Sequence, residues 1–428
     1  AFFERLGRDL RDYLDWVPLA PLCAYEFADG TRLHSYSDRA RFGTELEAAG
    51  VAKAAELDGY LERSARLWEW AGELFLTRSL HEPATYASRK GLKALLNAAR
   101  LSPFSNLHAA NARAFADPRA AQLFDRYATY NGSSPFRTPA TMRIIPHVEY
   151  AFGGYALKGG IVSLPRALER AARELGAEFR FGSRAERIVV ENGRCRGVEA
   201  GGERFPADVV VSNADVLSTY RTLLGRPEAP EARRYARLEP SSSGLVFLWG
   251  VKRRFPQMQV HNIFFSGDYR AEFDAIFGAL DVPAEPTVYV NVTSKVDPAD
   301  APPGGENWFV LLNAPRNAGQ DWPALAARAR QAVLKRLSRA LGCDVEPLIE
   351  VEKIIAPPDI ERDTGSTYGS LYGIASHSPV SAFLRHPNRS RRIGGLYFAG
   401  GSAHPGGGMP LALLSGTLAA DLAEKCEP

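Results

Sequence analysis

The chain has 428 residues, of which 45% are hydrophobic and 10% aromatic, enough to bury a large core in two or three structural units. Its 52 basic and 49 acidic residues leave a net charge of only +3, which excludes a nucleic-acid-binding protein with a basic surface throughout. Four widely spaced cysteines without histidines at zinc spacing predict thiols of a reducing compartment and no metal site. No apolar stretch reaches the roughly 20 residues that span a bilayer.

The N-terminal part is predicted to be helical with one short hairpin. Residues 1–13 combine acids, arginines and apolar residues in a pattern typical of an amphipathic helix. The sequence predicts that this helix is already in progress at residue 1. Two apolar runs around Asp29-Gly30 predict a strand, turn and strand over residues 22–36. From 43 to 80 the apolar residues recur at helical spacing, which predicts one long amphipathic helix.

The segment 83–116 contains no acidic residue. Leucines and Phe104 alternate in it with five basic residues, namely Arg89, Lys90, Lys93, Arg100 and Arg113. A basic amphipathic segment of this kind suits the surface of an anionic bilayer. A core helix with a solvated basic face fits the pattern equally well, so both interpretations stay open.

The pattern changes to α/β after residue 160. A helix over 164–175 is predicted to precede a strand at 178–181, a hairpin over 188–198 that turns at Asn192-Gly193, and a buried strand at 207–211. Further strands are predicted at 245–249, 262–265, 288–293 and 308–313, in a separate sheet. A helix follows at 323–341.

The closing segment is a strand, a glycine-rich turn and a helix. Residues 395–399 are apolar, five glycines lie between Gly400 and Gly408, and a helix with leucines on one face follows. Glycines let backbone N–H groups approach a ligand closely, and a helix start adds unpaired donors with partial positive charge. This order of elements predicts a site for an anionic or electron-rich group.

The closing segment resembles the C-terminal signature of the bacterial-type phytoene desaturases, carotenoid desaturases that bind FAD. Further similarity lies in Asn131-Gly132-Ser133-Ser134-Pro135-Phe136, His147-Val148-Glu149, Lys158-Gly159-Gly160 and Val210-Val211-Ser212-Asn213-Ala214-Asp215. The stretches 261–266 and 289–294 are most similar to the branch that acts on partly desaturated carotenoids. The resemblance implies an α/β fold, Rossmann-like and FAD-binding, with a substrate-binding sheet and a helical, membrane-associated insertion.

The same resemblance implies where FAD would be bound. Gly159-Gly160 would pass close to the flavin, and Ala185 would touch the adenine. The other implied contacts come from the closing turn, from Gly400, Gly401, His404, Pro405, Gly407, Gly408 and Met409. His404 has the alternative role of shaping the loop.

The candidate catalytic residues lie close together in the sequence around residue 147. His147 and Glu149 lie two apart, on one face if the segment is a strand, and Arg143 precedes them by four. A buried Glu149 would steady an allylic cation or accept a proton. The alternative, a structural ion pair between Glu149 and an arginine, is about equally supported.

One family feature is missing. Members begin with a strand, a Gly-x-Gly-x-x-Gly turn and a helix, and no such glycine triplet occurs here. The sequence is therefore interpreted as N-terminally truncated, and a preparation of these residues alone is expected to show no flavin absorbance.

The predicted organisation has five parts. Residues 1–42 connect the FAD and substrate domains, 43–130 are the helical insertion, 131–225 bind FAD, 226–385 form the substrate-binding part, and 386–428 supply the last FAD-binding strand, turn and helix. The predicted protein is a FAD-dependent desaturase of a C40 or C30 carotenoid, peripheral on the cytoplasmic side of the bacterial inner membrane.

Three alternatives remain on sequence grounds. The first is a carotenoid oxygenase, isomerase or retinoid saturase of the same fold. The second is an amine or porphyrinogen oxidase, disfavoured because His404-Pro405-Gly406 stands where a flavin-linking cysteine would be. The third is a flavin-free protein that binds a lipid or carotenoid.

Overall fold

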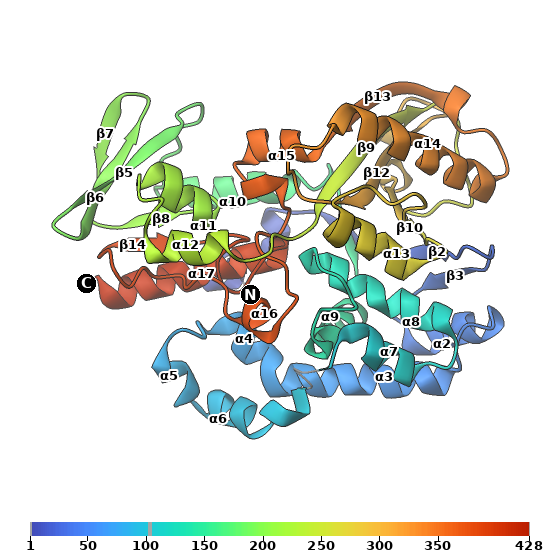
Figure 1. The fold of residues 1–428 in the computed structure, drawn as a ribbon, viewed down its shortest axis with the longest axis horizontal. Coiled ribbons are helices and arrows are strands. Elements are labelled where there is room, and N and C mark those ends of the chain that lie inside the picture. The colour runs from blue at the N-terminus through green and yellow to red at the C-terminus, as the bar shows by residue number, and fades with distance from the viewer. Residues whose placement is uncertain (1, 102–104, 428) are drawn as a thin grey trace.

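A seven-stranded sheet dominates one side of the molecule (Figure 1). The computed structural model describes residues 2–101 and 105–427. Only β10 and β2 run parallel, and all other neighbours in the sheet are antiparallel. The strands in spatial order are β13 (Ile349–Ile355), β9 (Ser243–Val251), β12 (Glu306–Ala314), β11 (Val288–Asn291), β10 (His261–Phe264), β2 (Cys23–Glu26) and β3 (Arg32–Ser35). All six segments predicted as strands in 22–36 and 245–313 are confirmed here.

The two faces of this sheet differ. Along β12, Trp308, Val310 and Leu312 are buried while the residues between them are half-exposed, as expected when one face meets a core. The helix α14 (Trp322–Leu341) shares that core through Val333 and Leu337. Within the described part of the chain the other face has no such cover along β12, and this asymmetry positions the site described below.

A helical layer lies beside the sheet. It contains α2 (Arg39–Ala48), α3 (Ala54–Leu67), a π-helical turn (Trp68–Gly72), α4 (Glu73–Thr77), α7 (Leu107–Ala114), α8 (Pro118–Asp125) and α9 (Ile144–Phe152). The prediction of one helix over 43–80 is wrong. Gly50 has φ +64° just after α2 ends, and Glu56 caps the backbone N–H of Lys53 at the start of α3, so the chain stops and restarts a helix.

Two short helices, α5 (Pro83–Tyr86) and α6 (Arg89–Leu96), extend from this layer at the lower left of Figure 1. A 3-10 turn at Ala98–Leu101 follows them. Phe104, counted above among the apolar residues of this segment, lies outside the described residues. Among the described residues, no helix is long and apolar enough to cross a membrane.

The opposite side of the molecule contains two of the smaller sheets, the three-stranded sheet and the β8–β14 pair (Figure 1). A three-stranded sheet has the order β5 (Ala185–Glu191), β6 (Arg194–Ala200), β7 (Glu203–Pro206), and a parallel pair joins β8 (Val210–Ser212) to β14 (Leu396–Phe398). Asn192 and Gly193 adopt φ +50° and +76° at the predicted hairpin turn. The strand β1 (Trp16–Pro18) pairs with β4 (Tyr155–Leu157).

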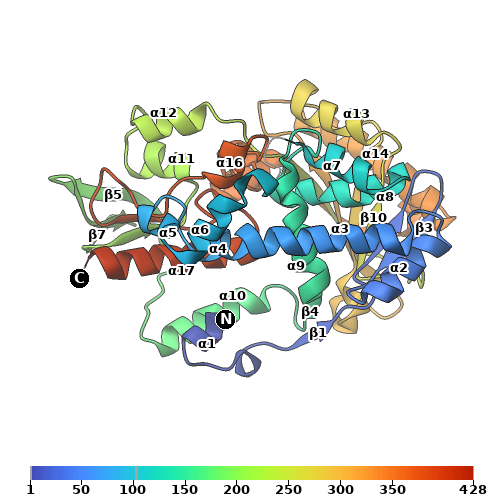
Figure 2. The same cartoon turned by 90° about the horizontal axis from the view of Figure 1, so that it is seen from below.

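Helices complete this side and the connections. They are α1 (Phe2–Arg5), α10 (Ser163–Glu174), α11 (Val216–Ser218), α12 (Pro230–Ala236), α13 (Tyr269–Asp274), α15 (Pro357–Thr364), α16 (Pro379–Phe383) and α17 (Met409–Cys426). Figure 2 shows α1 and α10 as a layer separate from α17. The helices predicted at 164–175, 323–341 and after the glycine turn are confirmed.

Three predictions on this side need correction. The N-terminal helix is short, because Gly7 with φ +67° follows α1. Residues 178–181 form no strand, since no described strand pairs with them, and Phe181 is exposed. The strand predicted as buried over 207–211 is limited to β8, where Val211 is half-exposed.

Candidate functional site

The glycine turn between β14 and α17 is built by close contacts that exclude side chains. A Cβ atom at Gly400, where φ is +100°, would lie 2.5 Å from Asn213 Oδ1. A Cβ atom at Gly407 would lie 2.6 Å from the Tyr372 ring. These distances are far below van der Waals contact, so glycine is required at both positions.

The start of α17 is open. Gly408 has φ +106°, no side chain caps the helix, and a Cβ atom at Gly408 would meet nothing within 4 Å. Met409, the first residue of the helix, is 54% exposed. The N–H groups of the first turn have no intrahelical partner, and the helix dipole makes this end partly positive. The helix start is therefore available to an electron-rich ligand.

Tyr372 connects the turn to a second predicted motif. A Cβ atom at Gly132 would lie 2.7 Å from the same ring, so the Tyr372 ring lies between Gly132 and Gly407. Ser133 Oγ accepts a 2.8 Å hydrogen bond from the Ser376 N–H. The 131–136 motif is thus packed against the segment that follows Tyr372, which sequence reasoning missed because a lone tyrosine in a loop carries no periodic signal.

Arg385 is buried beneath the turn. Its guanidinium donates hydrogen bonds to the carbonyl oxygens of Tyr372 at 2.6 Å, Ile374 at 3.0 Å and Gly401 at 3.3 Å. No carboxylate among the described residues pairs with it, and burial lowers its pKa to about 10. Arg385 therefore joins the turn to the Tyr372 segment mainly through backbone carbonyls, with a longer 3.4 Å hydrogen bond to the Ser376 hydroxyl. A buried arginine of this kind has no signature in the sequence.

His404 lies inside the protein, away from the helix start. Its Nε2 is 3.0 Å from the carbonyl oxygen of Arg78, and its ring meets Phe75 edge-on at 5.2 Å. Burial lowers its pKa to about 4, so the ring is neutral at pH 7. These contacts fit the alternative in which His404 shapes the loop, together with the buried Pro405.

The remaining predicted cofactor residues lie elsewhere. Gly159 and Gly160, with φ +73° and +77°, lie between β4 and α10. Ala185 is exposed at the start of β5. Figure 2 shows β4 and α10 in a layer separate from the helix α17 that follows the turn.

Two of the predicted catalytic residues, His147 and Glu149, lie on helix α9, so the strand assumed for them is wrong. In a helix two residues apart differ by about 200° around the axis, so His147 and Glu149 face different ways. The His147 ring packs against Trp68 at 5.6 Å, and burial lowers its pKa. Arg143, just before α9, lies 5.8 Å from the Tyr60 ring centroid, and burial lowers its pKa as well.

Glu149 is the acceptor of a buried network. Arg126 Nη2 donates to Glu149 Oε1 at 2.8 Å, and the hydroxyls of Tyr127 and Tyr130 donate at 2.9 Å each. The ion pair considered as an alternative is thus present, and its arginine is Arg126 rather than Arg143. Burial alone would lower the pKa of Arg126, but Glu149 and the surrounding tyrosines raise it.

Comparison with known proteins decides the family. A family model described as flavin containing amine oxidoreductase matches residues 3–423. The 1-hydroxycarotenoid 3,4-desaturase of Flavobacterium sp. strain P99-3 is 43% identical over 419 residues, which cover 98% of this chain and 85% of that protein. This chain belongs to the carotenoid desaturase family.

Two further comparisons show the desaturase's similarity to a carotenoid oxygenase in sequence and to an amine oxidase in fold. The 4,4'-diapolycopene oxygenase of Methylomonas sp. is 33% identical over 429 residues, which cover 98% of this chain and 85% of that protein. Cyclohexylamine oxidase from Brevibacterium oxydans IH-35A superposes with a TM-score of 0.57 at 16% identity, covering 99% of this chain and 84% of that one. The second likeness shows the fold alone, and it confirms the predicted flavoprotein architecture.

FAD is the cofactor of the desaturase, and the described residues fit it. The turn offers a side-chain-free surface at Gly400 and Gly407 and an uncapped helix start at Gly408, which suit a flavin edge that gains negative charge on reduction. The desaturase is therefore an FAD-dependent oxidoreductase, and the flavin-free alternative is set aside.

The open face of the seven-stranded sheet supplies an apolar surface beside this turn. Strand register places Phe309 opposite Leu248 and Leu311 opposite Tyr289 on that face, and Phe309 is 36% exposed. At its edge Leu371, the neighbour of Tyr372, lies 3.3 Å from the Cβ position of Gly244. The apolar face and the glycine turn therefore meet at residues 371–372.

Proposed function

We propose that the desaturase introduces a double bond into a long carotenoid that already carries a polar end group, as in the hydroxylated substrate class named for its relative. The observation that carries this proposal is the 43% identity to a 1-hydroxycarotenoid 3,4-desaturase over 98% of the chain. The apolar sheet face that meets the glycine turn at Leu371 and Tyr372 supports it, because a polyene needs such a surface.

Bound FAD supplies the acceptor for the hydrogen that leaves the substrate as hydride. The backbone N–H groups at Gly400, Gly401, Gly407, Gly408 and Met409 would hold the flavin, and Gly159, Gly160 and Ala185 would contact the rest of the cofactor. The half-exposed apolar side chains of β9, β11 and β12 hold the polyene and exclude water. Arg385 keeps the turn in place from below.

Glu149 is proposed to steady positive charge on the polyene. Arg126, Tyr127 and Tyr130 donate to its two carboxylate oxygens, which fixes the orientation of the carboxylate. An anion held by three donors is better suited to stabilising an allylic cation than to accepting a proton. Replacing Glu149 by Gln is expected to lower turnover at least tenfold while flavin content changes less than twofold. Unchanged turnover would remove Glu149 from the mechanism.

A polar spot on the open sheet face is proposed to contact the substrate's end group. His261 Nδ1 lies 2.7 Å from the Tyr289 hydroxyl and 3.2 Å from Asn291 Nδ2, on strands whose neighbouring positions are apolar. A hydroxyl both donates and accepts hydrogen bonds, as these groups do. The spot would therefore favour a hydroxylated end over a hydrocarbon end.

The assay uses the full-length chain with FAD and carotenoid in liposomes. We expect the absorption of a 1-hydroxycarotenoid to shift to the red with loss of two hydrogens by mass spectrometry. The variant His261→Phe should raise KM for the hydroxylated substrate and leave KM for its unhydroxylated counterpart unchanged. Oxygen incorporation instead of hydrogen loss would favour the oxygenase activity named for the Methylomonas relative.

We also propose that the desaturase docks on the cytoplasmic side of the bacterial inner membrane through α6. Its Leu92, Leu95 and Leu96 are 56%, 53% and 77% exposed, beside Arg89, Lys90 and Lys93 on the same eight-residue helix. Exposed leucines next to cations suit an anionic bilayer. Flotation with liposomes should weaken when Arg89, Lys90 and Lys93 are changed to Glu, whereas undiminished binding would assign membrane contact to another surface.

A further inference from the structure

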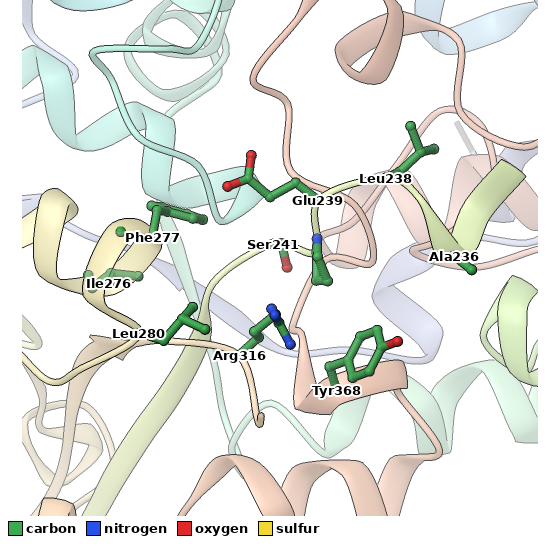
Figure 3. Close-up of a pocket in the computed structure, with 11 residues that line it drawn as sticks. Ala236, Leu238, Glu239, Ser241, Ile276, Phe277, Leu280, Arg316 and Tyr368 are labelled. Atoms are coloured by element: carbon green, nitrogen blue, oxygen red, sulfur yellow. The ribbon is translucent and has the colours of Figure 1, made fainter. Parts of the chain in front are cut away.

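A cavity of about 310 Å³ borders Ser241, whose Oγ accepts a 3.0 Å hydrogen bond from the Tyr372 N–H (Figure 3). Its walls come from the linker between α12 and β9, the π-helical turn Ala275–Ala279, and the segments at Arg316 and Tyr368. Leu238, Ile276, Phe277 and Leu280 make one part of the lining apolar. Figure 3 shows the Arg316 guanidinium between Leu280 and Tyr368. The cavity therefore combines flat apolar walls with one cation.

The two charged side chains that line this cavity differ in their partners. Glu239 is occupied by Arg137, whose two Nη atoms donate at 2.9 and 2.6 Å, and it lies 2.8 Å from His377 Nδ1. Among the described residues no carboxylate pairs with Arg316, whose guanidinium carbon lies 5.3 Å from the Tyr368 ring centroid. Arg137 is thus the partner of Glu239, and Arg316 remains the cation of the lining that no described carboxylate pairs with.

Backbone strain is concentrated at the same place. Among described residues only Asn192, Leu280 and Tyr368 adopt a positive φ without being glycine, and Leu280 and Tyr368 both line the cavity. Tyr368 is held in this conformation by hydrogen bonds at both ends of the residue, from the Asn317 N–H to its carbonyl oxygen at 2.8 Å and from its own N–H to Glu361 Oε1 at 3.1 Å. Bulky residues persist in such conformations mainly where surrounding structure enforces them, often at ligand sites.

We propose that this cavity binds a small organic anion with a flat, unsaturated body, its acid group on Arg316 and its body against Phe277, Leu280 and Tyr368. A planar guanidinium binds a carboxylate through two parallel hydrogen bonds, and flat bodies stack well on aromatic and aliphatic walls. The volume suits a ligand of one or two rings. This binding site goes beyond the proposed desaturation and does not depend on it.

The proposal is tested by calorimetric titration of the FAD-loaded, full-length chain with 2-naphthoate, with 2-naphthamide as the uncharged counterpart. Naphthoate is expected to bind at least tenfold more tightly than naphthamide. The variant Arg316→Met should lower the affinity for naphthoate at least tenfold, and Arg316→Lys should recover part of it. Affinities are expressed per flavin-containing protein, so that incomplete folding does not mimic lost binding.

A matched control is available at Arg270, which is exposed and lies 4.0 Å from the Phe136 ring but does not line the cavity. Arg270→Met should bind naphthoate as the unmodified protein does. Absence of naphthoate binding at millimolar concentration, equal binding of the amide, or equal binding by Arg316→Met would each overturn the proposal. None of these outcomes bears on desaturase activity, which is measured with carotenoid alone.

Discussion

Two buried arginines of this desaturase are held in different ways. Arg126 is paired with a carboxylate, Glu149, and with two tyrosine hydroxyls, and these neighbours raise its pKa despite burial. Arg385, only 2% exposed, has backbone carbonyls as its main acceptors, and its pKa falls to about 10. Carbonyl dipoles thus satisfy the hydrogen bonds of the buried guanidinium, but they stabilise its positive charge less than water or a counter-ion would.

The largest effect should come from breaking the ion pair. Arg126→Met leaves the Glu149 carboxylate without its counter-ion and should lower the free energy of unfolding by about 3–5 kcal/mol. Arg385→Met leaves only neutral carbonyls unpaired and should cost about 1–3 kcal/mol. Urea unfolding of the full-length protein measures both, and equal losses would contradict the distinction drawn between the two arginines.

A double variant serves as the control for this pair. Removing Glu149 as well, in Arg126→Met with Glu149→Leu, should restore about half of the stability lost in the single variant, because no uncompensated charge remains. A double variant that is less stable than Arg126→Met would show that the tyrosine hydroxyls, rather than the charges, hold this region together.

Glu272 extends the comparison to an anion held by neutral donors. Its Oε2 accepts hydrogen bonds from the hydroxyls of Ser266 and Thr287 at 2.7 Å each, yet burial raises its pKa to about 7. Between the unfolded value of 4.5 and about 7 the folded protein binds a proton that the unfolded chain has released. The free energy of unfolding should therefore fall as pH rises through this window, by about 3 kcal/mol in total.

Glu272→Gln should abolish that part of the pH dependence. Urea unfolding at pH 5 and pH 8 compares the variant with the unmodified protein, and the variant should be the more stable of the two at pH 8. A slope that is the same in both proteins would mean that Glu272 titrates normally in the fold.

The smallest effects are expected in the turn above Arg385. Gly407→Ala places a methyl group 2.6 Å from the Tyr372 ring and should cost about 1–3 kcal/mol of stability through overpacking, with loss of bound flavin seen in the absorption spectrum. Gly416→Ala in α17, where a Cβ atom meets nothing within 4 Å, should instead add about 0.5–1 kcal/mol. Full flavin retention by Gly407→Ala would mean that the Tyr372 ring moves aside.

Local sequence patterns correctly predicted the elements that depend on residues close together in the chain. The hairpin at Asn192-Gly193, the amphipathic helix α14 and the strand, turn and helix at the C-terminal end each follow from residues close together in the chain. The prediction failed where contacts with residues distant in the sequence determine the secondary structure. Residues 178–181 have strand-like composition but no partner strand among the described residues, and the segment at His147 alternates like a strand but packs as a helix against Trp68.

The candidate site divides in the same way. The turn at Gly400–Gly408 was predictable because five glycines lie within nine residues, and Asn213 belongs to a stretch picked out by its resemblance to the family. Arg126, Tyr372 and Arg385 reach it from distant segments, and nothing in their local sequence marks them as buried. The sequence analysis gave Glu149 two possible roles, one of them an ion pair with an arginine. It could not identify Arg126 as that arginine, because the two residues are 23 positions apart.

The position of the Tyr372 ring has a mechanical consequence. The backbones at Gly132 and Gly407 leave no room on either side of the ring. Rotation of the ring would therefore require both backbone segments to move. Leu371, at the edge of the apolar face, is its chain neighbour. A polyene on the apolar face would therefore contact a residue whose neighbouring ring has no room to turn, so this edge of the face would be rigid.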